Sequence, residues 1–193
     1  MDRSWITASE EQLPLTREAA AYAAHMHEDQ RRADGSPFVL HPLEVGSLLH
    51  ATGAPDHLVA AGVMHDLLEK TPASASDLQE RFGPRVTGLV LAVTENERIS
   101  GYSRRKAALR QQVAEAGDEA LRLFAADKLS KLRELRAQAV DPQARDPRAR
   151  RLRHYRRSLA LLEERLPESP LVRELGAELA ALSRETGTLA RAG

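Results

Sequence analysis

A histidine and an aspartate stand side by side in a segment that is otherwise almost wholly apolar. The segment covers residues 56–69, and its second half carries the ionisable side chains of His65, Asp66 and Glu69. At about 100° per residue these three side chains fall on one flank of a helix, while apolar side chains cover the rest. A helix that is apolar nearly all round is a buried helix. The sequence therefore predicts a buried helix that brings three ionisable groups into the core.

Two carboxylates and an imidazole in a core need compensating partners, because unpaired charges are costly to bury. A bound cation compensates them best, since carboxylates and neutral imidazoles are ligands of divalent metals. We expect Gly62, one turn before Asp66, to leave this flank open for an ion or a substrate. Two further candidate ligands are His41, where a loop meets a helix, and Asp127, beside the apolar stripe of a later helix.

Each candidate ligand also has an ordinary structural explanation. A His-Asp pair is common, His41 can simply cap a turn, and Asp127 can pair with Lys131 across one helical turn. Buried ion pairs are often structural rather than functional. Taken one at a time, these residues leave both interpretations open.

Almost every periodic segment of the chain predicts a helix, so the predicted fold class is all-α. Thr16 and Asp56 are placed to cap the first helix and the buried helix, and either Ser74 or Ser76 to start a short helix that ends at Gly83. Strand signals are weak, and aromatic residues make up only 4% of the chain. The expected helices cover approximately residues 16–30, 41 onward, 56–69, 76–83, 84–93, 104 onward, 119–139, 148–166 and 171–184.

The prolines between residues 141 and 147 mark the expected joint between two parts of one domain. We predict a core over residues 1–140 and additional C-terminal helices, residues 141–193, that pack on it. The 193 residues suffice for one sizeable core.

Composition removes several classes of function. Lys and Arg total 28 and so do Asp and Glu, so no global field attracts nucleic acid or a membrane. The chain has no cysteine, which excludes disulfides, thiol nucleophiles and thiolate zinc sites. Its start is unlike a secretory signal and no apolar run approaches membrane-spanning length, so we expect a cytoplasmic protein.

Several motifs occur in an order and spacing that resemble a known family. They read Asp34-Gly35-Ser-Pro-Phe-Val-Leu-His41-Pro42, His65-Asp66-x-x-Glu69, Phe82-Gly83, Val93-Thr94 and Ala126-Asp127-Lys128-Leu129. Together they resemble the HD-domain hydrolases, and more narrowly the hydrolase half of the RelA/SpoT alarmone enzymes and the small alarmone hydrolases. The resemblance covers approximately residues 16–135. It implies a helical HD-domain bundle.

The resemblance also implies a single divalent metal, usually manganese, held by His41, His65, Asp66 and Asp127. Mixed imidazole and carboxylate ligands suit Mn²⁺, with Fe, Zn, Co and Mg as alternatives. Such an ion makes water a better nucleophile and polarises a phosphoryl oxygen. Glu69 is the expected catalytic residue beside Asp66, placed to hold or deprotonate that water. Its alternative role is to support a metal ligand.

The resemblance assigns substrate contacts as well. Arg32 matches the family's base-stacking arginine, and Arg151 with Tyr155 matches a pair that contacts the far side of the nucleotide. Lys70 stands where alarmone hydrolases carry the second acid of an acidic pair, and Lys131 where they carry an asparagine near the ribose. These two lysines are therefore expected to contact a changed substrate.

Two further features depart from the family pattern or extend it. A family lysine next to the stacking arginine is replaced by Ala33. The basic run over residues 104–106 can face phosphates, although three charges on a helix are more often a solvated face.

We therefore predict a metal-dependent phosphohydrolase that acts on a nucleotide or a related small phosphate ester, resembling (p)ppGpp 3′-pyrophosphohydrolases with altered substrate residues. The alternative is a non-catalytic HD module that binds a nucleotide for regulation. A nucleic-acid binder using residues 145–157 ranks last, because that basic run is short and lacks interleaved aromatics apart from Tyr155. The sequence gives no indication of the oligomeric state.

Overall fold

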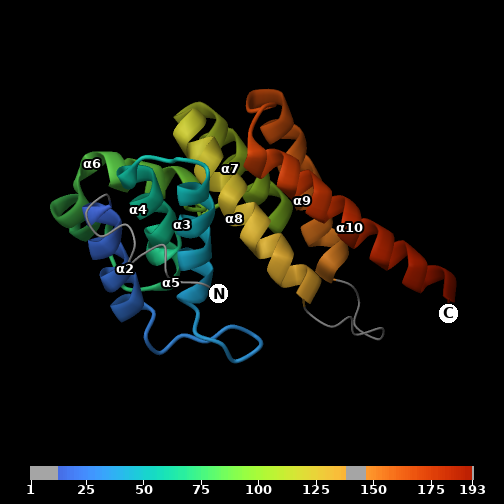
Figure 1. Ribbon diagram of the computed structural model, residues 1–193, viewed down its shortest axis with the longest axis horizontal. Helices are drawn as coiled ribbons and strands as arrows, with labels where there is room; N and C mark the ends of the chain where they lie inside the picture. Colours follow the sequence, from blue (N-terminus) through green and yellow to red (C-terminus); the bar gives the residue numbers. More distant parts are fainter. Residues whose placement is uncertain (1–12, 138–146, 193) are drawn as a thin grey trace.

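A computed structural model (Figure 1) describes residues 13–137 and 147–192, with the side chains of 147, 148 and 185–192 left out. Over these residues the chain forms helices and no strand, so the all-α prediction is confirmed. The helices are α2 (Pro14–Met26), α3 (Leu40–Ala51), α4 (Asp56–Met64), α5 (Leu67–Lys70), α6 (Ala75–Val93), α7 (Tyr102–Ala116), α8 (Asp118–Ala137), α9 (Pro147–Arg165) and α10 (Pro170–Ala192).

Helix α8 runs through the middle of the molecule (Figure 1) and contacts α3, α4 and α6 on one side and α7, α9 and α10 on the other. Its apolar stripe explains this position, because Leu121, Phe124, Leu129 and Leu132 are fully buried. Burying a side chain of this size contributes about 1.5–3 kcal/mol, so this helix anchors both halves of the core.

The buried helix predicted for residues 56–69 is interrupted at the His-Asp pair. Helix α4 ends at Met64, His65 and Asp66 form a turn, and α5 follows. The ring of His65 bonds the carbonyl of Gly62 (Nδ1 to O, 2.8 Å), which in an uninterrupted helix would accept the N–H of Asp66. The expectation of one continuous helix was wrong, although its burial is confirmed.

Asp56 caps a different helix from the one expected. Its carboxylate accepts the backbone N–H groups of Leu15 and Thr16, both at 2.9 Å, so it binds the start of α2 rather than of α4. The hydroxyl of Thr16 also donates to this carboxylate (2.6 Å), so Thr16 does not act as the predicted cap. A proline at position 14 has no N–H to satisfy, so Asp56 binds the next two free donors of the helix.

Gly62 allows two helices to pack closely. It does not leave an open flank for a ligand. A Cβ at this position would lie 2.6 Å from Leu49 Cδ1 and 3.5 Å from the backbone of Gly46. The missing side chain lets α4 approach α3 closely, and the expectation that Gly62 admits a ligand was wrong.

A short helix was predicted to start at Ser74 or Ser76 and to end at Gly83, and the structure starts it directly after Ser74. Ser74 and Asp77 form a reciprocal capping box at the start of α6. Gly83 has a φ of 80°, a left-handed conformation that kinks α6 before Pro84. The two segments therefore meet at a bend rather than in a straight helix.

Helices α9 and α10 form the C-terminal part, and both pack on α8 (Figure 1). Leu162, Leu171, Leu175 and Leu179 bury their side chains there. The predicted joint over residues 141–147 falls almost wholly outside the described residues. In the part of the chain that the structure describes, no helix combines the length and apolar character needed to cross a membrane.

Candidate metal centre and substrate pocket

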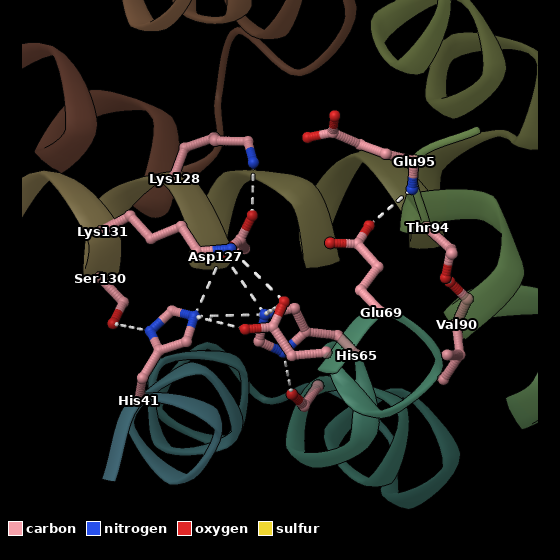
Figure 2. Close-up of polar contacts among 12 residues, drawn as sticks. His41, His65, Glu69, Val90, Thr94, Glu95, Asp127, Lys128, Ser130 and Lys131 are labelled. Carbon is pink, nitrogen blue, oxygen red and sulfur yellow. Dashed lines mark hydrogen bonds and ion pairs between the residues drawn. The ribbon is translucent and has the colours of Figure 1, made fainter. Parts of the chain in front are cut away.

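Four predicted ligands meet where three parts of the fold come together, and Figure 2 labels three of them, His41, His65 and Asp127. His41 lies in the first turn of α3, His65 and Asp66 form the turn between α4 and α5, and Asp127 lies midway along α8. All four are buried. The interruption after Met64 thus places two adjacent residues at the same point, facing a helix that is 61 residues further along the chain.

The ligand atoms are close enough to share one ion. His41 Nε2 lies 3.2 Å from His65 Nε2 and 3.3 Å from Asp127 Oδ1, and His65 Nε2 lies 3.4 Å from that same oxygen. Asp66 completes the group, with Oδ1 at 3.3 Å from His65 Nε2 and Oδ2 at 3.7 Å from His41 Nε2. Hereafter these four residues are called the ligand cluster.

Hydrogen bonds at the far side of each ring aim both imidazoles at this point. The Nδ1 of His65 faces a carbonyl, which only accepts, so this nitrogen donates and Nε2 carries the lone pair. The hydroxyl of Ser130 donates to Glu44 (2.7 Å) and therefore accepts from Nδ1 of His41 (2.8 Å). Both rings thus present an Nε2 lone pair to the cluster, the orientation expected of metal-binding histidines.

The donor set fits a divalent cation. Two imidazole lone pairs and two carboxylates converge, and Asp66 Oδ2 is buried without a hydrogen-bond partner among the described residues. Groups that only accept cannot satisfy one another, so the arrangement calls for positive charge at its centre. The ligand atoms of His41, His65 and Asp127 all lie within 4.8 Å of one another.

Two lysines from α8 already place positive charge beside the carboxylates (Figure 2). Lys131 Nζ lies 2.9 Å from Asp127 Oδ1 and 3.5 Å from Asp66 Oδ1, and Lys128 Nζ lies 2.5 Å from Asp127 Oδ2. Burial alone would raise the pKa of Asp127, but Lys128 and then Lys131 outweigh it and hold that pKa well below its ordinary value. Asp127 therefore stays ionised, as a metal ligand must.

The pKa values of the two histidines shift in opposite directions. Burial lowers the pKa of His41 and keeps its ring neutral. Burial also acts against the charge on His65, but Asp66 and Asp127 outweigh it and raise the pKa of that ring. The two carboxylates thus favour positive charge next to His65 Nε2. A bound cation would lie on that side of the ring.

Glu69 lies beside the cluster, one turn beyond the interruption. Its Oε1 accepts the backbone N–H of Glu95 at 2.6 Å, which fixes the carboxylate at the start of the segment after α6 (Figure 2). Burial, and then the charge of Asp66, raises the pKa of Glu69. A carboxylate with a raised pKa accepts a proton more readily than an ordinary glutamate does.

A pocket of about 520 Å³ opens over the ligand cluster, within the usual range for small-molecule sites. Glu69 and every predicted substrate residue line it: Arg32, Lys70, Lys131, Arg151 and Tyr155. The structure therefore brings together all the residues that the sequence assigned to the site, from helices on both sides of α8.

The substrate residues differ in how firmly they are held. Arg32 forms a two-point ion pair with Glu134 (Nη2 to Oε2, 3.0 Å; Nε to Oε1, 3.3 Å), which fixes its guanidinium at the pocket wall. Tyr155 is buried, and burial raises the pKa of its phenol to about 12. Lys70 and Arg151 are exposed at the pocket rim. Among the described residues, Lys70 forms no ion pair with the carboxylates that Lys131 pairs with, so the two lysines are not equivalent.

Several pocket residues lacked a clear sequence signal. Of the basic run over 104–106, only Lys106 lines the pocket, where it pairs with Glu95. Burial, with the charges of Lys128 and Lys131, lowers the pKa of Lys106 to about 8. His154, which lines the pocket, and Ser130, which orients His41 from outside it, were also missed, because one serine and one histidine on amphipathic helices carry no distinguishing pattern.

Comparison with known proteins identifies the family. A family model described as an HD domain matches residues 19–155. The chain belongs to the HD-domain family. The match includes every member of the ligand cluster, and the HD fold predicted from the sequence is confirmed.

The relatives of this HD-domain chain include hydrolases of guanosine bis(diphosphate). It is 38% identical over 127 residues to a mouse protein and 34% over 122 residues to one from Drosophila melanogaster, both named guanosine-3′,5′-bis(diphosphate) 3′-pyrophosphohydrolase MESH1. In both cases the match covers 61% of this chain and 68% of the relative. It is also 31% identical over 98 residues to the bifunctional (p)ppGpp synthase/hydrolase SpoT of Escherichia coli, covering 51% of this chain and 14% of SpoT.

Solved structures of related proteins have the same fold as this chain. One described as a metazoan ortholog of SpoT that hydrolyzes ppGpp has a TM-score of 0.75 and 26% identity, covering 90% of this chain and 96% of that one. A Listeria monocytogenes protein has a TM-score of 0.66 and 28% identity, covering 75% of this chain and 94% of that protein. The prediction of an HD-family hydrolase homologous to the (p)ppGpp 3′-pyrophosphohydrolases is thereby confirmed.

Proposed function

We propose that this protein is a metal-dependent phosphohydrolase that cleaves a pyrophosphate group from a nucleotide of the (p)ppGpp class or a close analogue. The observation that carries the proposal is the meeting of two imidazole lone pairs and two carboxylates in the wall of a pocket lined by cations. Phosphoryl transfer is catalysed mainly by positioning and by positive charge, and this pocket supplies both. The names of its relatives point to the same reaction.

His41, His65, Asp66 and Asp127 would hold one divalent ion, which we propose is Mn²⁺. Equal numbers of nitrogen and oxygen ligands suit manganese, although iron, zinc, cobalt and magnesium share parts of this preference. When bound, the cation supplies a Lewis acid that polarises a phosphoryl oxygen and makes water a stronger nucleophile.

Glu69 and Asp66 are the proposed catalytic residues. Glu69 is fixed through one oxygen by the N–H of Glu95, which leaves its second oxygen to orient a water and accept its proton. The raised pKa of Glu69 favours this transfer. Asp66 keeps its charge, because Lys131 and the two imidazoles outweigh burial and lower its pKa, so it can orient the attacking water.

Five side chains are proposed to bind the substrate. The guanidinium of Arg32, held flat by Glu134, stacks on the base. Lys70 and Lys131 bind phosphate oxygens, and Arg151 with Tyr155 contacts the far side of the nucleotide from α9.

The lysines also indicate which substrate the pocket prefers. Lys131 pairs with both carboxylates of the cluster, so its charge adds to that of the metal. A pocket with extra positive charge favours a more anionic or differently placed phosphate than the standard alarmones offer. A cytoplasmic location, where phosphorylated nucleotides occur, is part of the proposal.

The decisive experiment compares wild type with Glu69→Gln. Metal content is measured first, followed by phosphate and pyrophosphate release from a panel of nucleotides that includes guanosine tetraphosphate. We expect Glu69→Gln to keep its metal and fold but to slow turnover by about two orders of magnitude or more, because the amide cannot accept a proton.

Two results would contradict the proposal. Equal turnover by Glu69→Gln would reduce Glu69 to a support for the fold. No turnover by the metal-loaded wild type on any phosphate ester, with retained nucleotide binding, would favour a non-catalytic module.

A further inference from the structure

A chain of polar contacts leads away from the ligand cluster on the far side of the His41 ring (Figure 2). The Nδ1 of His41 donates to the hydroxyl of Ser130 (2.8 Å), which donates in turn to Oε2 of Glu44 (2.7 Å). The other oxygen of Glu44 accepts from Nη1 of Arg133 (3.3 Å), and Nη2 of Arg133 pairs with Glu174. These contacts join α3, α8 and α10, and we call them the His41 relay.

The His41 relay runs from the core to the surface. Ser130 is fully buried, the side chain of Glu44 is 13% exposed, and that of Glu174 is 46% exposed. A carboxylate as buried as that of Glu44 is costly even when it is paired, so the pair by itself adds little to stability. The position of Glu44 therefore calls for a role other than holding the fold together.

The two imidazoles of the ligand cluster are fixed by partners of different kinds. His65 faces the backbone carbonyl of Gly62, which can only accept, so the tautomer of that ring has one solution. His41 faces a hydroxyl, which can donate or accept. Ser130 alone would therefore allow either tautomer of His41.

Glu44 removes this ambiguity. Its carboxylate can only accept, so it draws the proton of the Ser130 hydroxyl toward itself and leaves only lone pairs for His41. The Nδ1 of His41 must then donate, and Nε2 keeps the lone pair that a cation needs. A hydroxyl turned the other way would donate to Nδ1, and the proton of the neutral ring would move to Nε2.

We propose that Glu44 is a positioning residue of the metal centre, because it acts through Ser130 to hold His41 in the tautomer that binds a divalent cation. Arg133, anchored on α10 by Glu174, keeps the carboxylate of Glu44 in place. This role rests on the proposed metal centre and deepens it, since Glu44 lies outside the pocket lining and would still set metal affinity.

The test measures metal affinity rather than turnover. Wild type, Glu44→Leu, Ser130→Ala and the double variant are titrated with Mn²⁺ in competition with a chelating dye. Each single change should lower the affinity by about tenfold or more, as is typical when the support of a metal ligand is lost. Because both changes break one relay, the double variant should bind no more weakly than the weaker single variant. In Glu44→Leu, Arg133 keeps Glu174 as its partner, so the change leaves no unpaired charge.

A spectrum and a matched control exclude a general structural effect. Co²⁺ has visible absorption bands that depend on its ligands, so Glu44→Leu should change the spectrum of the cobalt-loaded protein. Glu178 pairs with Arg136 between the same two helices (3.0 Å), outside the His41 relay, so Glu178→Leu should keep the affinity and the spectrum. Thermal unfolding of the metal-free proteins checks the fold, and Ser130→Ala carries the test if Glu44→Leu does not fold.

Wild-type affinity in a folded Glu44→Leu or Ser130→Ala variant would overturn this role of Glu44. Additive losses in the double variant would also overturn it, because the two residues would then act separately. A wild type that binds no divalent metal would overturn both the proposed metal centre and the relay. A wild type that binds metal but hydrolyses no phosphate ester would contradict the proposed hydrolase alone.

Discussion

At the ligand cluster, the carboxylates of Asp66 and Asp127 face two kinds of positive charge. Lys131 contacts both of them, and Lys128 contacts Asp127. Without a metal the two acids and two lysines balance each other. On our proposal, a divalent ion would enter a site that is already neutralised, and Lys131 would compete with it for the same oxygens.

The first prediction concerns Asp127. Asp127→Ala removes a proposed metal ligand and leaves Lys128 and Lys131 without the carboxylate that they pair with, so metal content should fall sharply. The free energy of unfolding should fall by about 3–5 kcal/mol, as for other broken buried pairs. Elemental analysis and chemical denaturation measure the two effects. Glu80→Ala, which removes an exposed carboxylate, is the control. Full metal occupancy in Asp127→Ala would remove this residue from the site.

A second prediction concerns the two lysines that depart from the alarmone hydrolases. We expect weak hydrolysis of guanosine tetraphosphate by the wild type, and a gain of roughly tenfold or more in kcat/KM for Lys70→Asp combined with Lys131→Asn. The double change lowers the positive charge near the metal and relieves the competition for Asp66 and Asp127. Steady-state assays under Mn²⁺ make the comparison, with Lys131→Asn alone to separate the lysine that pairs with the carboxylates from the exposed Lys70. Efficient wild-type turnover would show that the lysines are tolerated.

At the scale of helices, one carboxylate adds hydrogen bonds to the packed contact between α2 and α4. Asp56 starts α4 and at the same time binds the first free N–H groups of α2. A cap supplied by a different helix couples the two, because neither can move without breaking these bonds.

The third prediction tests this coupling. Asp56→Ala leaves the N–H groups of Leu15 and Thr16 without their acceptor, and it should cost about 1–2 kcal/mol in the free energy of unfolding. Urea denaturation measures the loss. Glu18→Ala, an exposed change on the same helix, should have a much smaller effect. Equal losses in the two variants would contradict a specific role of the cap.

At the scale of the whole molecule, the C-terminal helices complete both the core and the pocket. The division into residues 1–140 and 141–193 is a proposal, within which α9 and α10 cover one side of α8. Helix α9 also brings Arg151, His154 and Tyr155 to the pocket. We therefore propose that the second part is an integral piece of one domain.

The fourth prediction follows from this packing. A chain that ends at residue 140 exposes the apolar face of α8 and loses the buried leucines of α9 and α10, each worth about 1.5–3 kcal/mol. We expect it to lack a cooperative thermal transition or to unfold at a much lower temperature, as followed by circular dichroism. A transition at the wild-type temperature would show that the first part folds alone.

The sequence by itself determined the helical class and singled out the four residues that the fold brings together as the ligand cluster. Apolar periodicity marks the helices, and the motifs around His41, His65, Asp66 and Asp127 have a spacing that resembles one family. Both kinds of information are local, because they depend on residue type and on separation along the chain. The placement of Glu69 beside these ligands was predicted for the same reason.

Only the tertiary structure decided what several other residues do. Asp56 caps a helix 40 residues away, Gly62 lets α3 approach, and Ser130 orients His41 from α8. The relay through Glu44 is visible only once α3, α8 and α10 meet. Capping, close packing and charge compensation depend on which elements touch, and residue patterns along one helix carry no information about a partner that is distant in the chain.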